Sequence, residues 1–319
     1  MIKERNIFVF DDNEGVADFA VTKWIEISSQ AIVNKGYFSA ALSGGKTPVE
    51  FYKRLAASEN ILSWDRTHLF SADERFVPPS HNESVADFAV TKWIEISSQA
   101  IVNRGYFSAA LSGGKTPVEF YKRLAASENI LSWDRTHLFS ADERFVPPSH
   151  NESNYGLIKE HLLSYVKIPA ENVHRIQTEE ITLEESARRY EEDIRRFFRI
   201  EGGSVPQFDL IMLGIGEDGH TASLFPGKSS LQETRRLAIP VIAERFPGER
   251  ITITLPVINN ARKIIFLVSG RDKAKVLKEI IEDKNASLPV SRVNPKYGMV
   301  YFLVDKPAAS ILSGRKMGQ

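Results

Sequence analysis

The stretch FSAALSGGKTPVEFYKRLAA, residues 107–126, decides the fold. It opens with a short apolar run, Phe107 to Leu111, which predicts a buried strand. Two glycines follow, and then Thr116 is placed as a helix N-cap, with Pro117 at the first helical position and Glu119 completing a capping box. A strand that passes through a glycine turn into a helix is the building unit of parallel α/β sheets.

The rest of the chain continues this alternation of short apolar runs with amphipathic stretches. We expect further strands at Asn6–Phe10, Phe38–Leu42, Thr67–Ala72, Thr136–Ala141, Asp209–Leu213, Ile251–Leu255, Lys263–Val268 and Met299–Val304. We expect further helices at Val16–Asn34, Pro48–Ala57, Val85–Asn103, Leu183–Ile200 and Lys273–Glu282. The pattern predicts the α/β class, with a mostly parallel sheet and helices on both faces.

Residues 16–84 recur at residues 85–153 with one difference, Lys35 against Arg104. Solenoid repeats have periods of about 20 to 50 residues and many diverged copies, whereas this chain carries two long copies that are almost identical. We therefore interpret the repeat as a tandem duplication inside one domain that spans residues 1–319. Without the extra 69 residues the chain has 250 residues, a normal size for one large α/β domain.

The extra copy must be accommodated somewhere in that domain. We expect the second copy to build the sheet and the excess to be inserted between Asp11 and Gly15, because everything from Val85 onward is then continuous. A hybrid path that begins in the first copy and continues in the second is also physically allowed. The excess copy can pack on a sheet edge, stay loosely ordered, or exchange with another molecule and so form a segment-swapped dimer.

Composition narrows the function classes. The chain has 41 basic and 41 acidic residues and a formal net charge of zero, which argues against a nucleic-acid or anionic-membrane partner. It has no cysteine, which excludes disulfides, thiolate metal sites and cysteine nucleophiles. The apolar run Ile7 to Phe10 is too short for a signal peptide or a membrane span, so we expect a soluble cytoplasmic protein.

Two motifs follow predicted strands. In Ser112-Gly113-Gly114-Lys115-Thr116, the glycines and the helix start can receive an anion such as phosphate, although a tight turn without a ligand fits equally well. It is not a nucleotide-binding P-loop, because Ala109 stands where that motif needs glycine. In Asp142-Glu143-Arg144, the arginine can grip phosphate or stabilise an oxyanion, and the alternative is a solvated ion pair.

The third motif, GIGEDGHTASLFP at residues 214–226, follows the strand Asp209–Leu213. Its start matches G-x-G-x-x-G, but Ile239-Pro240-Val241 stands where a dinucleotide site needs an acid after its next strand. His220 beside Asp218 on a glycine-rich turn suits a general base. A lone histidine is more often structural, so this interpretation needs independent support.

Together the motifs Ser112–Pro117, Ala141–Pro147, Ser153-Asn154 and Gly214–Pro226 resemble the 6-phosphogluconolactonase family, which is related to glucosamine-6-phosphate isomerases. Arg250–Thr254, Ser269-Gly270 and Lys273 extend the match. The resemblance implies a Rossmann-like three-layer α/β/α fold that needs neither metal nor cofactor. It also implies hydrolysis of 6-phospho-D-glucono-1,5-lactone to 6-phosphogluconate in the pentose phosphate pathway, with His220 activating a water molecule.

The resemblance extends to individual site residues. Asp218 would orient His220, and Arg144 would stabilise the oxyanion or grip the substrate. A larger group would bind the substrate and its phosphate: Ser112, Gly113, Gly114, Lys115, Thr116, Asp142, Asn154, Arg250 and Lys273. For Arg250 and Lys273, a strand-edge cation and a helix-surface lysine are the plain alternatives.

Three rival functions remain open at this stage. A glucosamine-6-phosphate deaminase or isomerase would share the phosphate loop and the Asp-Gly-His turn, but the residues after His220 follow the lactonase pattern. A sugar-phosphate sensor is disfavoured, because no helix-turn-helix segment or basic tract is visible. A sugar-phosphate-binding protein whose catalysis is disabled by the duplication is the third.

Overall fold

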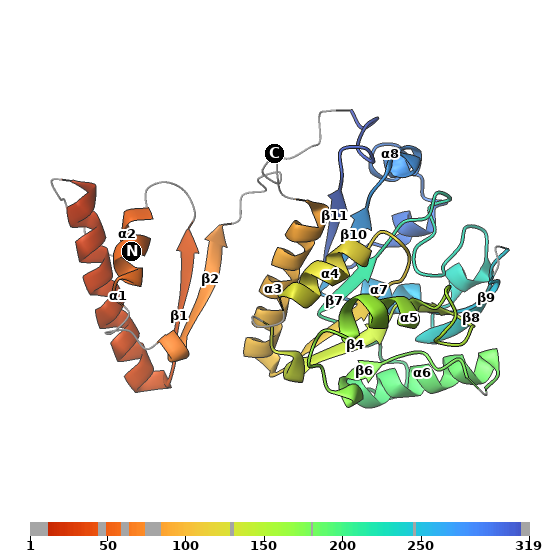
Figure 1. The fold of residues 1–319 in the computed structure, drawn as a ribbon, viewed down its shortest axis with the longest axis horizontal. Helices are drawn as coiled ribbons and strands as arrows, with labels where there is room; N and C mark the ends of the chain where they lie inside the picture. The colour runs from red at the N-terminus through yellow and green to blue at the C-terminus, as the bar shows by residue number, and fades with distance from the viewer. Residues whose placement is uncertain are drawn as a thin grey trace, which may run out of the picture. The chain divides into compact units, whose positions relative to one another are not determined.

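The computed structural model describes residues 12–43, 49–58, 64–73, 84–127, 131–179, 181–244 and 247–313. They form two compact units, an N-terminal unit within residues 1–78 and a C-terminal unit within residues 79–317 (Figure 1). The repeated helix–strand–helix–strand pattern occurs once in each unit. The single domain expected over residues 1–319 stays a prediction, and the expected strand Asn6–Phe10 lies outside the described residues.

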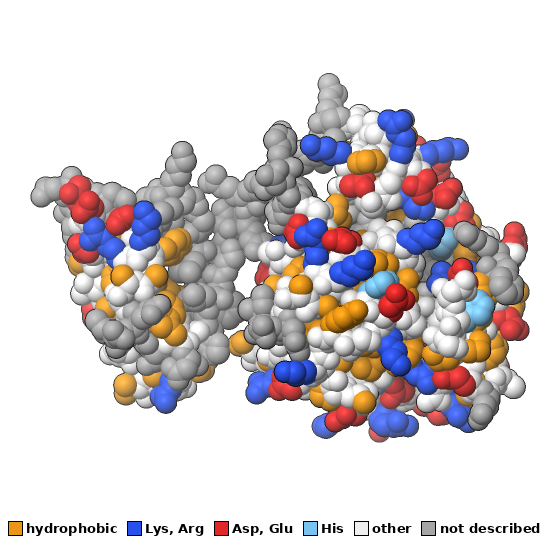
Figure 2. All heavy atoms as spheres, viewed as in Figure 1, with side chains coloured by type: hydrophobic (Ala, Val, Ile, Leu, Met, Phe, Trp, Pro, Cys, Tyr) orange, Lys and Arg blue, Asp and Glu red, His pale blue; other side chains and the backbone are white. Residues whose placement is uncertain are grey.

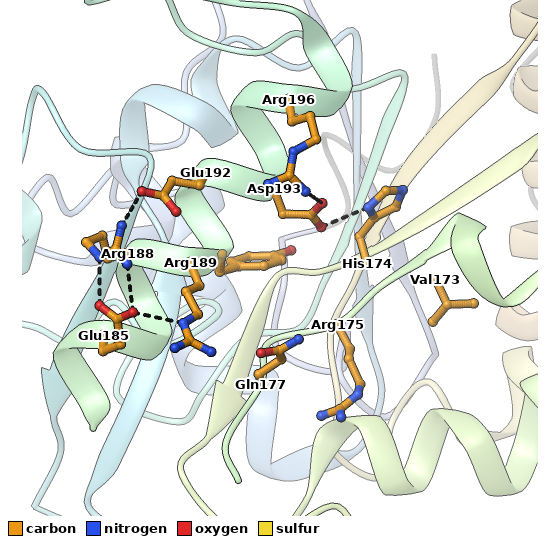
Figure 3. A pocket seen from close by; sticks show the side chains of 11 residues that line it. Val173, His174, Arg175, Gln177, Glu185, Arg188, Arg189, Glu192, Asp193 and Arg196 are labelled. Carbon is orange, nitrogen blue, oxygen red and sulfur yellow. Dashed lines mark hydrogen bonds and ion pairs between the residues drawn. The ribbon is translucent and has the colours of Figure 1, made fainter. Parts of the chain in front are cut away.

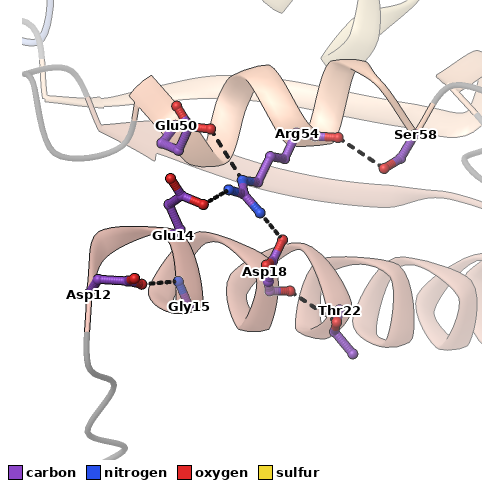
Figure 4. Close-up of polar contacts among 8 residues, drawn as sticks. All are labelled: Asp12, Glu14, Gly15, Asp18, Thr22, Glu50, Arg54 and Ser58. Carbon is purple, nitrogen blue, oxygen red and sulfur yellow. Dashed lines mark hydrogen bonds and ion pairs between the residues drawn. The ribbon is translucent and has the colours of Figure 1, made fainter.

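The N-terminal unit contains α1 (Asn13–Lys35), β1 (Phe38–Ser43), α2 (Val49–Ala56) and β2 (Thr67–Asp73), with β1 and β2 paired in parallel. Asp12 caps α1 by accepting from the Gly15 N–H over 2.8 Å. Arg54 of α2 donates to Glu14 and Asp18 of α1 and to Glu50 of its own helix (Figure 4). Ion pairs of this exposed kind are worth little individually. The two helices also make an apolar contact, with the Trp24 and Phe51 ring centroids 5.8 Å apart.

The C-terminal unit is larger. Its helices are α3 (Val85–Arg104), α4 (Val118–Ala126), α5 (Asn154–Ile158), α6 (Leu183–Phe198), α7 (Leu255–Asn259) and α8 (Ala274–Ile281). Its strands are β3 (Phe107–Leu111), β4 (Thr136–Ser140), β5 (Asp142–Arg144), β6 (Val173–His174), β7 (Leu210–Leu213), β8 (Ala238–Ile242), β9 (Glu249–Ile253), β10 (Lys263–Val268) and β11 (Met299–Val304). Six of these strands form one sheet in the order β11-β10-β7-β3-β4-β6, and every neighbouring pair is parallel.

Both faces of this sheet are buried. Leu210 and Met212 of β7 belong to an apolar cluster with α3 and α4, whereas Ile211 and Leu213 belong to a second cluster with α6, α7 and α8. Successive strand residues point to opposite faces, which explains the division. The predicted α/β class, with a mostly parallel Rossmann-like sheet between two helical layers, is confirmed. The sheet contains the second copy of the repeat, as expected.

A smaller antiparallel sheet, β5-β9-β8, was not predicted. The strand expected at Ile251–Leu255 is instead Glu249–Ile253, and Leu255 begins α7. The shift has a local cause, because Thr254 and the following Leu255-Pro256 suit a helix start with proline in the first turn. This small sheet matters because it carries Arg144 and Arg250.

Basic and acidic side chains lie interspersed over the face of the molecule shown in Figure 2. This distribution fits the formal net charge of zero. Within the described ranges, no helix has the length and apolar character needed to span a membrane.

Candidate active site

The strands β4, β3, β7 and β10 are consecutive neighbours and run in parallel, so their carboxyl ends lie at one edge of the sheet. The segments that follow these ends are Ser112–Thr116, Asp142–Arg144, Gly214–His220 and Ser269–Lys273. The chain builds the sheet outward from β3 to β4 and β6, and then adds β7 on the other side of β3. Such a switch point is where open α/β sheets bind ligands, and it brings the predicted motifs together.

The turn after β3 is shaped by its glycines. Gly114 has a φ of 89°, a left-handed conformation that favours glycine. The Ser112 backbone oxygen accepts a 2.6 Å hydrogen bond from the Tyr121 hydroxyl of α4, which fixes the start of the turn. The Ser112 hydroxyl is buried and has no hydrogen-bond partner among the described residues. Lys115 is exposed and Thr116 half-buried, so both are accessible from solvent.

The predicted capping box at this turn is wrong. Helix α4 begins at Val118, its N-cap position is Pro117, and no side chain caps it. Glu119 instead bonds Arg123 one turn further along the helix, at 2.9 Å. The reason is local: the backbone turns once more at Lys115, whose oxygen accepts from the Val118 N–H over 3.4 Å, and this turn moves the helix start past Thr116.

The turn after β7 places His220 against Asp218. The His220 Nδ1 lies 2.5 Å from Asp218 Oδ1, and the His220 backbone N–H donates to the same oxygen over 3.1 Å. A Cβ at Gly216 would overlap the imidazole ring, so glycine is required for the ring to fold back over the turn. Burial raises the pKa of Asp218, but its bonds with His220 outweigh burial and hold that pKa below the ordinary value.

Two arginines meet on the small sheet. Arg144 of β5 and Arg250 of β9 are direct cross-strand partners, so their side chains leave the sheet on the same face. The Arg144 Nη1 donates to the backbone oxygen of Glu152 over 3.0 Å and to the side-chain oxygen of Asn154. Its buried Nε has no partner among the described residues. Sequence alone gave no reason to pair positions 144 and 250.

Phe225 joins the histidine to this arginine pair. The His220 ring centroid lies 4.7 Å from that of Phe225, and the Arg250 guanidinium lies 5.6 Å from the same centroid. The motif that carries His220 therefore packs on the sheet that carries Arg250. A cation close to the base is well placed for the negative charge of a substrate.

Asp142 and Asn154 connect the two turns. The Ser223 hydroxyl donates to Asp142 Oδ2 over 2.7 Å, and the Asn154 Nδ2 donates to the Asp142 backbone oxygen over 2.9 Å. A Cβ at Gly113 would overlap the Asn154 side chain. The structure thus joins the glycine turn after β3 to the His220 turn after β7. Substrate contact by Asp142 and Asn154 stays a prediction.

Lys273 lies at the end of a 3₁₀ turn, one residue before α8. Its Nζ lies 3.1 Å from Asp272 and 3.9 Å from Glu217, which belongs to the His220 turn. The side chain is mostly buried, so it is not the free helix-surface lysine of the plain alternative. The structure brings Lys273 to the same edge as His220.

Comparisons with known proteins agree with this geometry. A family model described as glucosamine-6-phosphate isomerases/6-phosphogluconolactonase matches residues 11–98 and 82–302. The chain belongs to this family. The two matched ranges overlap the two copies of the repeat, and the second extends through β11.

Relatives in the family are similar over most of their length. The 6-phosphogluconolactonases of Rattus norvegicus and Homo sapiens are each 41% identical over 215 residues, which cover 66% of this chain and 82% of the relative. The solved 6-phosphogluconolactonase of Thermotoga maritima has 33% identity and a TM-score of 0.61, covering 70% of this chain and 95% of that one. A monomeric glucosamine-6-phosphate deaminase at 21% identity and a TM-score of 0.58 shares the fold.

Sequence reasoning gave no role to Glu143, Ser223 or Phe225, although all three lie inside its motifs. Glu143 is buried and accepts four hydrogen bonds, which only its tertiary neighbours reveal. A signal did exist for Phe225, because a large aromatic residue before Pro226 at the end of a polar turn suits a packing role. Nothing in the local pattern indicated the bond between Ser223 and Asp142, which are 81 positions apart.

A cavity of about 520 Å³ lies elsewhere, between β6 and α6 (Figure 3). Its lining contains no predicted site residue; it consists of Val173, His174, Arg175, Gln177, Glu185, Arg188, Arg189, Tyr190, Glu192, Asp193 and Arg196. Arg188 and Arg189 pair with Glu185, and His174 pairs with Asp193. These charges already satisfy one another. In the described part of the chain, no group of three or more carboxylate or histidine side chains is arranged to hold a metal ion.

Proposed function

We propose that this chain hydrolyses 6-phospho-D-glucono-1,5-lactone to 6-phosphogluconate, as an enzyme of the pentose phosphate pathway. One observation carries the proposal: His220 is held against Asp218 over Gly216, at the carboxyl end of β7, in a chain that belongs to the family. The relatives at 39–41% identity bear the name 6-phosphogluconolactonase. The substrate is a small sugar-phosphate lactone, and the proposed reaction uses no cofactor.

His220 acts as the general base. Its Nδ1 donates to the Asp218 carboxylate, which leaves Nε2 as the unprotonated nitrogen. Nε2 takes a proton from water as the water oxygen attacks the lactone carbonyl. The negative Asp218 stabilises the imidazolium that forms, and the proton then passes to the leaving ring oxygen. A positioned base of this kind typically contributes about 10² to 10⁴-fold in rate.

Arg144 stabilises the oxyanion that forms from the carbonyl oxygen, and its cross-strand partner Arg250 belongs to the group that grips the phosphate. The turn with Gly113 and Gly114 receives the phosphate through backbone N–H groups. The Ser112 hydroxyl, which has no hydrogen-bond partner among the described residues, donates to it. The remaining residues predicted to bind the substrate and its phosphate are Lys115, Thr116, Asp142, Asn154 and Lys273. Holding a remote phosphate fixes the lactone for attack.

The rival functions make different demands. The family description includes glucosamine-6-phosphate isomerases, but the solved deaminase in the comparison is 21% identical, whereas the relatives at 39–41% identity are named 6-phosphogluconolactonase. A disabled binding protein would keep the phosphate turn and yet show no turnover. An assay of lactone hydrolysis distinguishes both from a lactonase, because neither would hydrolyse the lactone above its spontaneous rate.

The test is hydrolysis of freshly prepared 6-phosphogluconolactone above its spontaneous rate. The chain should hydrolyse the lactone and should not deaminate glucosamine 6-phosphate. His220→Ala should lower kcat by about 10² to 10⁴-fold, while His161→Ala, at a histidine whose ion-pair partner is Glu160, should leave it unchanged. Absence of turnover in the unmodified chain would overturn the proposal, and equal turnover in His220→Ala would remove the base.

We propose that the enzyme is cytoplasmic.

We also propose that the extra copy is exchanged between two molecules, which forms a segment-swapped dimer. The dimer is supported by the near identity of the copies and by Ile27, which is 54% exposed in the first copy, whereas its counterpart Ile96 is 6% exposed. Light scattering should show a dimer fraction that disappears when residues 16–84 are deleted. A dimer fraction that persists in the deletion variant would contradict the exchange.

A further inference from the structure

Glu143 is a buried carboxylate with a role in no reaction step described above. It lies in β5 between Asp142 and Arg144, and only 2% of it is exposed. It accepts from three backbone N–H groups, of Arg144, Asn154 and Tyr155, at 2.8, 2.6 and 2.7 Å. The Ser153 hydroxyl completes the set at 3.2 Å.

Most of these donors belong to the start of α5. The backbone N–H groups of Asn154 and Tyr155 are in its first turn, where no carbonyl of the helix can accept from them. Ser153 caps the same turn by accepting from the Gly156 N–H over 3.0 Å. Glu143 therefore fixes the N-terminal end of α5 to β5, through backbone N–H groups that have no acceptor within the helix.

Asn154 transmits this fixed position to the active site. Its side chain is buried and occupies the space directly against Gly113 of the phosphate turn. Its oxygen accepts from Arg144 and its nitrogen donates to the Asp142 backbone oxygen. A displacement of Asn154 would move the phosphate turn and the Arg144 guanidinium together.

We propose that Glu143 is a positioning residue. By holding the first turn of α5, it places Asn154 between Gly113 and Arg144. This placement aligns the phosphate-binding turn with the arginine that stabilises the oxyanion. The proposal rests on the lactonase function proposed above. It gives Asn154 a structural task in the site, since both of its amide atoms bond protein groups.

The repeat supplies an internal comparison. The first copy contains the same residue type at Glu74, but Val85 follows Ser84 where Asn154 follows Ser153. Valine offers neither the acceptor for an arginine nor the donor for a backbone oxygen. The first copy by itself cannot build this alignment.

The experiment compares Glu143→Gln with Glu74→Gln, the same substitution in nearly the same sequence. Glutamine keeps the shape of the side chain but turns an acceptor into a donor that faces backbone N–H groups. At a pH where the carboxylate is ionised, kcat/KM for 6-phosphogluconolactone should fall about 100-fold in Glu143→Gln, since misplacement by about 1 Å costs about that much. Glu74→Gln should be unchanged.

Two further readouts separate positioning from mere stability. Calorimetric binding of 6-phosphogluconate should weaken about 10-fold in folded Glu143→Gln, with the rest of the loss in kcat. Asn154→Ala should give a similar loss, and the double variant should be little worse than either single variant, because both act along one path. Losses that multiply in the double variant, or unchanged kinetics in Glu143→Gln, would overturn the proposal.

Failure of the lactonase function would look different. The unmodified chain would then show no turnover, whereas binding of 6-phosphogluconate would still compare Glu143→Gln with Glu74→Gln. If Glu143→Gln does not fold, Asn154→Ala alone tests the alignment, because it leaves the bonds of Glu143 in place. Unchanged kcat/KM and unchanged binding in Asn154→Ala would then reject it.

Discussion

The two copies of the repeat place nearly the same sequence in two surroundings. Trp24 lies 5.0 Å from Phe38 at an interplanar angle of 84°, and Trp93 lies 5.0 Å from Phe107 at 85°. Helices α1 and α3 both end at a left-handed glycine, with φ of 82° and 83°. Local structure therefore follows the local sequence in both units.

The burial of equivalent side chains, in contrast, differs between the two copies. In the C-terminal unit, Trp93 and Ile96 pack in one cluster with apolar residues of β7, β10 and β11, namely Leu210, Met212, Ile265, Leu267 and Leu303. The described residues of the N-terminal unit contain β1 and β2 but no strands equivalent to β7, β10 and β11, and Ile27 is exposed. The comparison teaches that this segment forms its elements alone but needs distant residues to cover its apolar face.

The ends of the copies show the same dependence. Ser84 caps α3 by accepting from the Asp87 N–H over 3.2 Å, and its counterpart Ser153 caps α5 by accepting from the Gly156 N–H over 3.0 Å. The same residue starts two different helices because different sequences follow it. Only the second continuation contains Asn154.

The largest expected difference is in stability. Trp93→Ala should lower the unfolding free energy of the C-terminal unit by about 3–5 kcal/mol, because it empties a fully buried aromatic position. Trp24→Ala should leave this unit unchanged. Hydrogen exchange of the β7 and β10 amides measures both. Equal losses in the two variants would mean that the copies exchange places in the sheet.

The next difference is in activity. Arg144→Ala should lower kcat/KM by about 10² to 10³-fold, the usual cost of losing a donor to a developing oxyanion. The matched Arg75→Ala, in the first copy, should retain full activity. Steady-state hydrolysis of the lactone decides the matter, and a loss in Arg75→Ala would assign the working site to the first copy.

The raised pKa of Glu143 predicts that the unfolding free energy depends on pH. Burial raises its pKa to about 7, against the opposing effect of its three backbone donors. The folded chain then keeps a proton on Glu143 that the unfolded chain releases near pH 4.5. The stabilisation that this proton gives the folded state is complete below pH 4.5 and is lost as the pH rises to about 7. Relative to Glu143→Gln, the unmodified chain should lose about 3 kcal/mol of unfolding free energy across this window.

Urea unfolding at several pH values measures this effect, and Glu74→Gln serves as the matched control. The control should track the unmodified chain at every pH. A constant difference between the unmodified chain and Glu143→Gln across the window would show that the carboxyl does not titrate there.

The smallest effect concerns the one position that differs between the copies. Arg104 pairs with buried Asp209, which also accepts from the Ser108 N–H over 2.9 Å. Arg104→Lys should cost about 1 kcal/mol, because lysine offers a single point charge in place of the planar guanidinium. Lys35→Arg should change nothing. Thermal unfolding of both variants compares them, and equal stability of Arg104→Lys and the unmodified chain would remove this anchor.

Much of the fold could be predicted because its long elements have clear periodicity. The helix Leu183–Ile200 and the strand Lys263–Val268 were predicted close to their observed bounds. The small antiparallel sheet escaped prediction, because β5 has three residues and all of them are charged. The strand β5 pairs with β9 through residues far apart in the sequence, since Arg144 and its partner Arg250 are 106 positions apart.

The site divides in the same way. His220 and Asp218 are two positions apart on a glycine turn, so their pairing follows from local geometry. The buried position of Glu143 and the approach of Asn154 to Gly113 do not, because they require α5 to dock on β5. Thr116 was misplaced as a cap since a turn at Lys115 competes with the helix start.

The sequence by itself determined the α/β elements, the repeat and the motifs, because helix periodicity, glycine turns and caps act over a few residues. Only the tertiary structure decided that the second copy stands beside β7 and that Glu143 holds Asn154. The physical reason is that two nearly identical segments have nearly the same local preferences. What separates them is the apolar surface that distant strands bring to the second copy and the hydrogen-bond donors of the residues that follow it directly.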